Sequence, residues 1–400
     1  MDKECDRVDP LSSLLQLAPS QKLEKGLLYT PKEIAQQPET WTRTLPQLTG
    51  RAAELQEFLT AAGLRGSPEQ RPDVLLVGAG TSDFIGQSLH LLLRKQWQCA
   101  VAPVASTSLL TNFTEYLLPD RKYLWISFSR SGDSPEGVAV LERALEERAE
   151  IFHLLVTCNA SGRMSQMVAG RARCLAVTLD EVTNDRGLAM TSSFTNMVLT
   201  GQFLAHAWTS GQYEPIVGRL AASAHALMPA AAELADEMAR QDFVRACFVG
   251  SGALAGAAQE CALKTLELTA GRVLTVAQTT LGLRHGPMAA LDAQTLLVNL
   301  VSSERAARHF DVNLLREIGS KRLVRTRIAV AADSGQLGQD ADYVLAAPGA
   351  AAIPDLYRPP LDVLFGQLLG LFASLRCGLK PDDPSPNGAI SRVVPAIEHS

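Results

Sequence analysis

Four serines surround one glycine in the stretch SFSRSGDSPE, where Ser127, Ser129, Ser131 and Ser134 flank Gly132. The hydroxyl groups and free N–H groups of such a turn can converge on the three oxygens of a phosphate monoester. No fixed salt bridge is needed, which suits a small metabolite that must be released. A single serine is more typical of a turn or a helix cap, but the cluster as a whole favours a phosphate site.

A second glycine-rich turn, with the letters GAGTSD, covers residues 78–83. It begins like the dinucleotide fingerprint G-x-G-x-x-G, but Asp83 replaces the third glycine and puts a negative charge where a pyrophosphate would lie. This mismatch disfavours nicotinamide and flavin cofactors, and the sequence has no P-loop motif. The hydroxyls of Thr81 and Ser82 are available to complete the phosphate site. Arg130 either adds a positive charge or is solvated, and the sequence leaves both alternatives open.

Both turns follow a short apolar strand and precede a helix. VLLVGAGTSDFIGQSLHLLLRK and YLWISFSRSGDSPEGVAVLERALEE each contain a strand, a turn and a helical pattern in that order. In the second, Ser134 caps the helix and Pro135 takes its first position. Helix N-termini present unpaired N–H groups and partial positive charge, so they favour an anion at these turns. Further strands are expected in FHLLVTCNASGRMSQM and CLAVTL, and a helix in SSFTNMVLTGQFLAHAW.

The same pattern starts again in the second half of the chain. ACFVGSGALAGAAQECALKTLEL resembles VLLVGAGTSDFIGQSLHLLL, with Gly250 and Gly252 in the places of Gly78 and Gly80. Strands follow around RVLTV, TLLVNLV, RIAVAA and YVLAAP, and a helix in PPLDVLFGQLLGLFASLRCG. Short apolar strands that alternate with helices predict parallel sheets covered on both faces. We expect residues 1–50 to form an N-terminal helical segment, 51–215 a first domain, and 216–400 a second domain with a C-terminal tail, with residues 212–240 as the helical connector.

The start of the regular pattern is expected in TPKEIAQQPETW. Thr30, Pro31 and Glu33 have the spacing of a capping box with a proline start. Pro46 is expected to separate two helices, because proline lacks the N–H that a helix interior needs.

The composition argues against several classes of protein. The chain has 37 basic and 42 acidic residues, so the positive surplus of a nucleic-acid-binding protein is missing. No apolar run approaches the roughly 18 residues of a membrane span, and the acidic N-terminus lacks the apolar core of a signal peptide. The seven cysteines are scattered without a CxxC pair and the seven histidines are dispersed, which favours a cytoplasmic protein with reduced thiols and no metal site.

Four motifs together resemble the sugar isomerase (SIS) family, which includes the isomerase half of glucosamine-6-phosphate synthase. GAGTSD, SFSRSGDSPE, ALKTLEL and LRHGPMAAL occur in this order, within a resemblance that begins at about Tyr29. It implies two tandem flavodoxin-like SIS domains of the α/β class, each a five-stranded parallel sheet with helices on both faces, and a homodimer or larger assembly with active sites near the interface. TPKEIAQQPETW and KPDDPSPNGAISRVV are similar to the tandem-SIS enzymes described as galactosamine-6-phosphate deaminase/isomerase or tagatose-6-phosphate ketose/aldose isomerase.

The resemblance also implies roles for matching residues. Glu267, in ALKTLELT, matches the glutamate that carries the proton, and His285, in RHGP, matches the histidine linked to opening of the sugar ring. In the synthase that histidine is offered to the neighbouring subunit's site, and we expect the same here. The sugar phosphate is expected to contact Thr81, Ser82, Ser129, Ser131 and Ser134, with further candidate contacts at Gly80, Ser127, Arg130, Gly132 and Thr191. A lysine in the synthase's C-terminal tail falls near Ile390 and is absent here, which argues against synthase chemistry.

The chemistry of these two residues agrees with such roles, although each has a simpler explanation by itself. A carboxylate can move a proton between carbons 1 and 2 of a sugar when burial raises its pKa. On sequence alone, Glu267 is more typical of a surface pair with Lys264 or Arg272. His285 alone is more typical of a loop histidine held by the backbone, but it lies in a loop, where reactive residues are commonly presented.

Three functions remain open from the sequence. The preferred one is an amino-sugar-phosphate deaminase that converts galactosamine 6-phosphate, or a close hexosamine 6-phosphate, into tagatose 6-phosphate and ammonia without a metal or an organic cofactor. The second is a tagatose-6-phosphate ketose/aldose isomerase, which uses the same proton transfer without loss of an amine. The third is a non-catalytic sugar-phosphate sensor, which would not need Glu267 or His285. The choice between galacto and gluco substrates depends on one hydroxyl's partners in the folded site.

Overall fold

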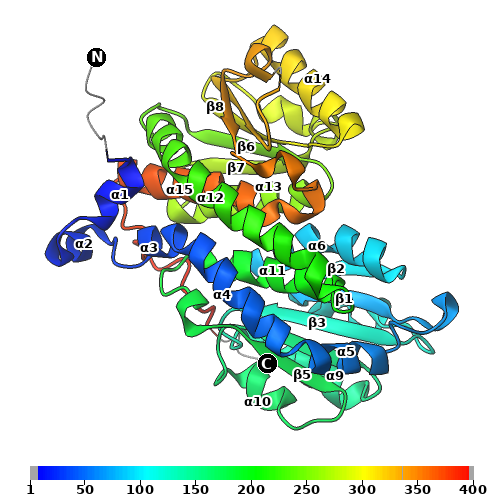
Figure 1. The fold of residues 1–400 in the computed structure, drawn as a ribbon. Coiled ribbons are helices and arrows are strands. Elements are labelled where there is room, and N and C mark those ends of the chain that lie inside the picture. The colour runs from blue at the N-terminus through cyan, green and yellow to red at the C-terminus, as the bar shows by residue number, and fades with distance from the viewer. Residues whose placement is uncertain (1–7, 336, 396–400) are drawn as a thin grey trace.

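The computed structural model describes residues 8–335 and 337–395 of the chain, which form two parallel sheets of five strands each (Figure 1). The first sheet has the order β2-β1-β3-β4-β5. The second has the order β10-β9-β8-β6-β7, which is the same order read from β7. The strands are β1 (Asp73–Gly78), β2 (Val101–Ala105), β3 (Tyr123–Ser129), β4 (Phe152–Thr157), β5 (Cys174–Thr178), β6 (Arg245–Gly250), β7 (Leu274–Thr279), β8 (Thr295–Val301), β9 (Thr326–Ala331) and β10 (Tyr343–Ala346). The predicted α/β fold with a repeated parallel sheet is confirmed.

Helices cover both faces of each sheet, and the inner helices of the two halves pack against one another between the sheets (Figure 1). The inner helices are α6 (Thr81–Trp97) and α11 (Ser192–Ala205) of the first half, and α13 (Ala253–Leu268) and α15 (Pro359–Arg376) of the second. The outer face of the first sheet carries α7 (Ser106–Thr111), α8 (Phe113–Tyr116), α9 (Pro135–Glu147) and α10 (Arg163–Val168), and that of the second carries α14 (Arg305–Lys321). One hydrophobic core runs through the inner helices of both halves.

Small residues allow α13 and α15 to approach closely. A Cβ on Gly366 of α15 would lie 2.4 Å from the sulfur of Cys261 on α13, and a Cβ on Gly370 would lie 3.0 Å from the carbonyl oxygen of Lys264. Glycine is therefore required at Gly366, because any larger residue would push the helices apart. This contact fixes α13 and the side chains that α13 directs toward the first half.

The long helix α12 (Ser210–Ala239) connects the halves, as expected for residues 212–240. The expected domain boundary between residues 215 and 216 falls inside this helix. β2 is the strand that the sequence pattern did not reveal, because Pro103 interrupts its apolar run. Proline is tolerated there because β2 is an edge strand of the sheet.

The N-terminal segment is helical, but two local predictions are wrong. Its helices are α1 (Pro10–Leu15), α2 (Pro19–Lys25), α3 (Thr30–Ala35), α4 (Gln37–Gly50) and α5 (Ala52–Ala61). The predicted capping box is not formed, because the side chain of Thr30 does not cap α3. The carboxylate of Glu33 instead accepts hydrogen bonds from the backbone N–H groups of Arg186 (2.6 Å) and Gly187 (3.2 Å).

The second wrong prediction is a helix break at Pro46, which lies inside α4. Pro46 is exposed, and so is Thr42, whose carbonyl loses its helical partner and can be hydrated instead. On the opposite face, Trp41 and Leu48 are buried in the core, and their packing keeps the helix continuous.

Among residues 8–335 and 337–395, no helix has both the length and the apolar character that crossing a bilayer requires. The same part of the chain contains no group of three or more His, Cys, Asp or Glu side chains placed to hold a metal ion. The six cysteines in it are all free.

Candidate active site

A cavity of about 380 Å³ opens at the carboxyl ends of β1 and β3 and is lined by both halves of the chain. Ligands of open parallel sheets bind at this edge, where turns lead into helix N-termini. The first half contributes the two predicted turns, at residues 78–82 and 127–134. The second half contributes Lys264 and Glu267 of α13, and residues 388–395 of the C-terminal tail form a further wall.

The serine loop follows β3 and leads into α9, with Ser134 at the N-cap position and Pro135 at the first helical position, as predicted, but the Ser134 hydroxyl makes no capping hydrogen bond. The hydroxyl of Ser129 accepts a hydrogen bond from the N–H of Gly132 (3.1 Å), and that of Ser131 accepts one from Asp133 (3.2 Å). These contacts are the turn-forming role that single serines commonly have. A hydroxyl that accepts from the backbone still has its own proton to donate, so both serines stay available to an anion.

Neighbouring groups hold this loop in place. Asn159, after β4, donates from its amide to the carbonyl of Ser131 (2.8 Å). The carboxylate of Asp133 accepts from the N–H of Arg163, at the start of α10 (2.8 Å). Gly132 has a φ of 67°, which a residue with a side chain rarely adopts. The loop is therefore fixed before any ligand binds.

The first turn brings Thr81 and Ser82 to the same cavity, at the start of α6, and both are buried. The turn is tight, since a Cβ on Gly78 would lie 2.3 Å from the carbonyl carbon of Ser82. Thr81 also links the turn to the second half, because its hydroxyl lies 3.0 Å from the Lys264 ammonium, which donates to it. Ser106, at the start of α7, adds a buried hydroxyl without a hydrogen-bond partner among the described residues to the cavity wall.

Three charged residues share one face of α13, at spacings of four and three residues: Glu260, Lys264 and Glu267. The Lys264 ammonium donates to a carboxylate oxygen of Glu267 (2.6 Å) and lies 3.6 Å from a carboxylate oxygen of Glu260. The Lys264 side chain is 1% exposed, and that of Glu267 is 23% exposed toward the cavity. The expected pairing of Glu267 with Lys264 exists, but Lys264 is buried rather than solvated.

The two carboxylates that face Lys264 differ in burial. Glu260 is completely buried beneath Lys264, and burial raises its pKa to about 8. Burial also acts to lower the pKa of Lys264, but the nearby carboxylates of Glu260 and Glu267 outweigh it and raise that pKa. Burial thus drives Glu260 toward its uncharged form, while Lys264 and Glu267 form an ion pair at the cavity wall.

Arg130 lies in the serine loop, but its guanidinium is turned away from the serine hydroxyls. It donates to the carbonyls of Leu188 (3.2 Å) and of Arg392 in the C-terminal tail (2.6 Å). Burial lowers its pKa, and the carboxylate of Asp185 opposes that effect. The side chain of Arg392 in turn donates to the carbonyl of Asp185 (2.8 Å). Arg130 thus joins the loop to the tail that covers the cavity.

Most of the predicted site residues line the cavity, and three do not. Those in the cavity wall are Gly80, Thr81, Ser82, Ser127, Ser129, Arg130, Ser131, Ser134 and Glu267. Gly132 shapes the loop from behind, and the hydroxyl of Thr191 donates to Asp185 (3.1 Å). His285 is exposed after the short helix η3 (Gly282–Arg284) and does not line the cavity.

Sequence reasoning did not assign a role in the site to Glu260, Lys264, Ser106 or the tail. The spacing of Glu260, Lys264 and Glu267 was a usable signal, since positions i, i+4 and i+7 of a helix share one face. A helix that is otherwise apolar and carries three charges on one face must pair them or direct them into a site. The tail had no local signal of this kind. The resemblance pointed to it only through the synthase lysine that falls near Ile390, a residue that lines the cavity here.

Relatives and solved structures share this architecture. No family model matches the sequence. A Streptomyces coelicolor protein named AgaS is 36% identical over 378 residues, which are 94% of this chain and 96% of that protein. An Escherichia coli protein named D-galactosamine-6-phosphate deaminase AgaS is 34% identical over 372 residues, 92% of this chain and 94% of that protein. The crystal structure of tagatose-6-phosphate ketose/aldose isomerase from Escherichia coli has a TM-score of 0.81 at 34% identity, and covers 89% of this chain and 94% of that one.

The repeated sheets and the serine loop define a phosphosugar-binding α/β protein of the sugar isomerase class. With relatives at these identities over almost their full length, the chain belongs to the AgaS group of the sugar isomerase (SIS) family.

Proposed function

We propose that this chain is an amino-sugar-phosphate deaminase that converts galactosamine 6-phosphate and water into tagatose 6-phosphate and ammonia. The observation that carries the proposal is the Lys264–Glu267 pair, which faces the same cavity as the serine loop although 130 residues of chain separate them. The named activity of the E. coli AgaS relative supports the choice of reaction.

The phosphate is held by the serine loop and the turn before α6. Ser129, Ser131 and Ser134 donate their hydroxyl protons to it, and Thr81 and Ser82 complete the site from the other side. The N-termini of α6 and α9 add partial positive charge. Gly80 and Ser127 border this site, whereas Arg130 acts on it by fixing the loop and the tail.

Glu267 moves the proton. After the sugar ring opens, its carboxylate removes the proton from carbon 2. The C–H electron pair forms a double bond between carbons 1 and 2, and the carbonyl pair moves to O1, which takes up a proton from water to give an enaminol. Return of the proton to carbon 1 yields a ketimine at carbon 2, and water then replaces the nitrogen to give the ketone and ammonia. One carboxylate suffices, because the two carbons are adjacent and present the same face.

Lys264 pairs with Glu267 and holds its carboxylate at the cavity wall. Its ammonium also lies within hydrogen-bond distance of Thr81, so it is placed to stabilise negative charge that develops on the substrate between the two turns. Glu260 lies buried beneath it, where burial raises its pKa and favours its uncharged form. The mechanism uses no metal or organic cofactor.

We assign ring opening to His285, acting in the site of a second copy of the chain in a homodimer or larger assembly. His285 is exposed and does not line the cavity of its own chain, which supports this assignment. The nearby edge strand β7 is only partly covered, and Leu274 and Leu281 beside it are 60% and 42% exposed. We also propose a cytoplasmic location, which the six free cysteines support.

The second candidate is simple interconversion of tagatose 6-phosphate and its aldose. It is favoured by the E. coli structure named tagatose-6-phosphate ketose/aldose isomerase. Ammonia release from galactosamine 6-phosphate distinguishes the two reactions, and glucosamine 6-phosphate offered in parallel tests the configuration at carbon 4.

The variant Glu267→Gln tests the assignment. It keeps the size and the hydrogen bonds of the side chain but cannot accept the proton, so kcat should fall by about 10²–10⁴-fold. Binding of inorganic phosphate, measured by calorimetry, should stay within about threefold of the wild type, because the phosphate contacts are untouched. Glu142→Gln, at an exposed position of α9, is the matched control. Ammonia release by Glu267→Gln at a tenth or more of the wild-type rate would refute the role of Glu267.

A further inference from the structure

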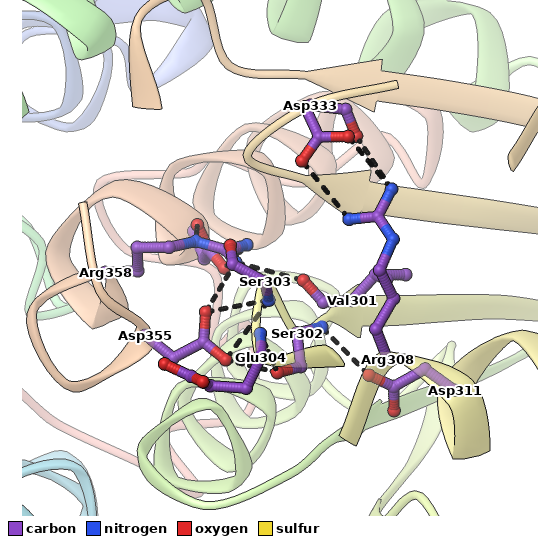
Figure 2. A network of polar contacts seen from close by, with 10 residues as sticks. Val301, Ser302, Ser303, Glu304, Arg308, Asp311, Asp333, Asp355 and Arg358 are labelled. Atoms are coloured by element: carbon purple, nitrogen blue, oxygen red, sulfur yellow. Dashed lines mark hydrogen bonds and ion pairs between the residues drawn. The ribbon is translucent and has the colours of Figure 1, made fainter. Parts of the chain in front are cut away.

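The second half contains its own counterpart of the serine loop. In both sheets the third strand along the chain lies beside the first, and the loop after it leads into an outer helix. In the first half this is the loop between β3 and α9. In the second half it is the loop between β8 and α14, where Ser302 and Ser303 follow the strand and Glu304 is the N-cap. Figure 2 shows the polar contacts around this loop.

An acidic side chain of the same chain occupies the second loop. The carboxylate of Asp355 accepts hydrogen bonds from the N–H of Ser303 at 2.9 Å and 3.2 Å, and from the hydroxyl of Ser302. The buried guanidinium of Arg358 donates to it as well (3.0 Å) (Figure 2). A backbone N–H, a serine hydroxyl and a cation converge on one carboxylate, which is the set of donors that oxyanions bind in proteins.

The remaining donors of this loop are also used internally. The N–H of Ser302 donates to Asp311 of α14 (2.8 Å), and the N–H of Glu304 donates to the hydroxyl of Ser302 (3.0 Å). The charge of Arg358 is shared with Asp362, which accepts from it at 2.6 Å. The Asp355 side chain is 12% exposed, so little solvent reaches the carboxylate.

The corresponding aspartate of the first half has different partners. Asp185 lies in the segment before α11, as Asp355 lies in the segment before α15. Its carboxylate accepts from the N–H groups of Thr191 (2.7 Å) and Ser193 (2.8 Å), at the start of its own helix. The first loop therefore keeps its hydroxyls for a ligand, while the second loop is filled.

We propose that the β8–α14 loop is an oxyanion site whose occupant is the carboxylate of Asp355, and that a small external carboxylate occupies it when Asp355 is removed. The inference goes beyond the reaction proposed above, and it stands whether or not the first loop binds a sugar phosphate. Because Asp355 fills the β8–α14 loop, only one of the two corresponding loops in each chain is open to an external anion.

The occupant also has a structural consequence for the first half. Asp355 begins the short helix η7 (Asp355–Tyr357), which packs against α6 and α13. Tyr357 is held there by the side chains of Gln202 (3.2 Å) and His206 (2.6 Å) of the α11 region. The filled loop thus anchors a turn that touches two of the helices that bring side chains to the cavity.

The test is rescue of Asp355→Gly by formate, which has the size and charge of the removed carboxylate. The full-length variant is heated in formate and in chloride at equal ionic strength. At about a hundred times its dissociation constant, formate should raise the unfolding midpoint of Asp355→Gly by about 3 °C more than that of the wild type. Formate that binds to the first loop raises both midpoints and cancels in the difference.

Asp333→Gly is the matched control, because Asp333 pairs with Arg308 in the same region and accepts nothing from the N–H groups of the loop (Figure 2). It should gain no more from formate than the wild type. If Asp355→Gly does not fold in chloride, the fraction that refolds in formate and in chloride gives the same comparison. Equal midpoints or equal refolded fractions in the two salts would overturn the proposal.

Discussion

At the end of β3 the serine loop opens into a cavity, whereas at the end of β8 the corresponding loop holds the carboxylate of Asp355. Both loops follow a fully buried strand and precede an outer helix. The difference lies in the segment before the last inner helix of each half. Asp185 turns toward its own helix and Asp355 turns toward the loop. The position of one carboxylate thus separates an anion loop that is open from one that is filled.

The filled half still contributes to the open one. Its first helix, α13, directs Lys264 and Glu267 across the molecule into the cavity of the first half. In the first half, the corresponding helix α6 begins at the cavity with Thr81 and Ser82. The two halves therefore contribute differently to the cavity, with the serine loop and the first turn from one half and the Lys264–Glu267 pair from the other.

The largest effect is expected when the sharing of the active site between two copies of the chain is tested. Glu267→Gln and His285→Asn should each be inactive alone. If His285 acts in the partner's site, a mixed dimer of the two variants has one site with both residues intact. Random mixing should then restore about a quarter of the wild-type rate of ammonia release, because half of the dimers are mixed and each has one working site.

The mixture must be unfolded and refolded together so that subunits exchange, and each variant refolded alone is the control. Recovery of activity in the mixture only would support sharing. No recovery, with both variants folded and dimeric by light scattering, would mean that His285 does not serve a neighbouring site.

The next largest effect is expected on acid stability, and it concerns two polar residues at matching positions of the two sheets. His153 pairs with Trp125 on β3, and Arg327 pairs with Leu297 on β8. Arg327 reaches Asp342 (2.7 Å), but neither ring nitrogen of His153 has a hydrogen-bond partner among the described residues. Burial lowers the pKa of His153 from 6.5 to about 4.

This pKa shift predicts acid sensitivity. In the unfolded chain His153 binds a proton below about pH 6.5, whereas in the folded chain it binds one only near pH 4. The unfolded chain therefore binds more protons in this range, and the free energy of unfolding falls as the pH falls from 6.5 to 4. The loss amounts to about 3 kcal/mol. His153→Leu should remove it, as measured by urea unfolding from pH 7 to pH 4. His309→Leu, at an exposed position of α14, should keep the wild-type pH dependence. A His153→Leu curve parallel to the wild type would contradict the prediction.

Much of the fold follows from local pattern in the sequence. Continuous apolar runs such as Val74–Val77 predicted buried parallel strands, and glycines after them predicted the turns. The pattern failed where distant groups decide the outcome. Glu33 has the spacing of a capping residue, but N–H groups about 150 residues away bind its carboxylate. Pro46 is a helix breaker by itself, but the packing of Trp41 outweighs its lost hydrogen bond.

Some parts of the site could also be predicted from the sequence, and others could not. The serine loop is contiguous in the sequence, so residue types and spacing indicated an anion. Lys264 and Glu267 reach that loop only because α13 packs against α6 and α15, which no local pattern contains. Family resemblance identified Glu267, whereas Lys264 was left as a surface partner. Nothing near Asp355 in the sequence indicated that it would fill the second loop.

The smallest effects are expected from replacing one serine in each loop by alanine, which compares the two loops directly. The hydroxyl of Ser134 lines the cavity and does not cap α9. Ser134→Ala should therefore raise the KM for the sugar phosphate about tenfold, the cost of one hydrogen bond to a charged group, and leave the unfolding midpoint unchanged. The hydroxyl of Ser302 is buried, donates to Asp355 and accepts from Glu304.

Ser302→Ala should therefore have the opposite result. It removes two buried hydrogen bonds, one of them to a carboxylate, and should lower the free energy of unfolding by about 2 kcal/mol while KM stays at the wild-type value. Together the two variants distinguish a loop that binds substrate from a loop that binds a side chain of the same protein. If Ser302→Ala raises KM as much as Ser134→Ala does, the second loop also contacts substrate, and the contrast between the halves fails. If Ser134→Ala lowers stability without changing KM, the first loop is a structural turn and the phosphate is bound elsewhere in the cavity.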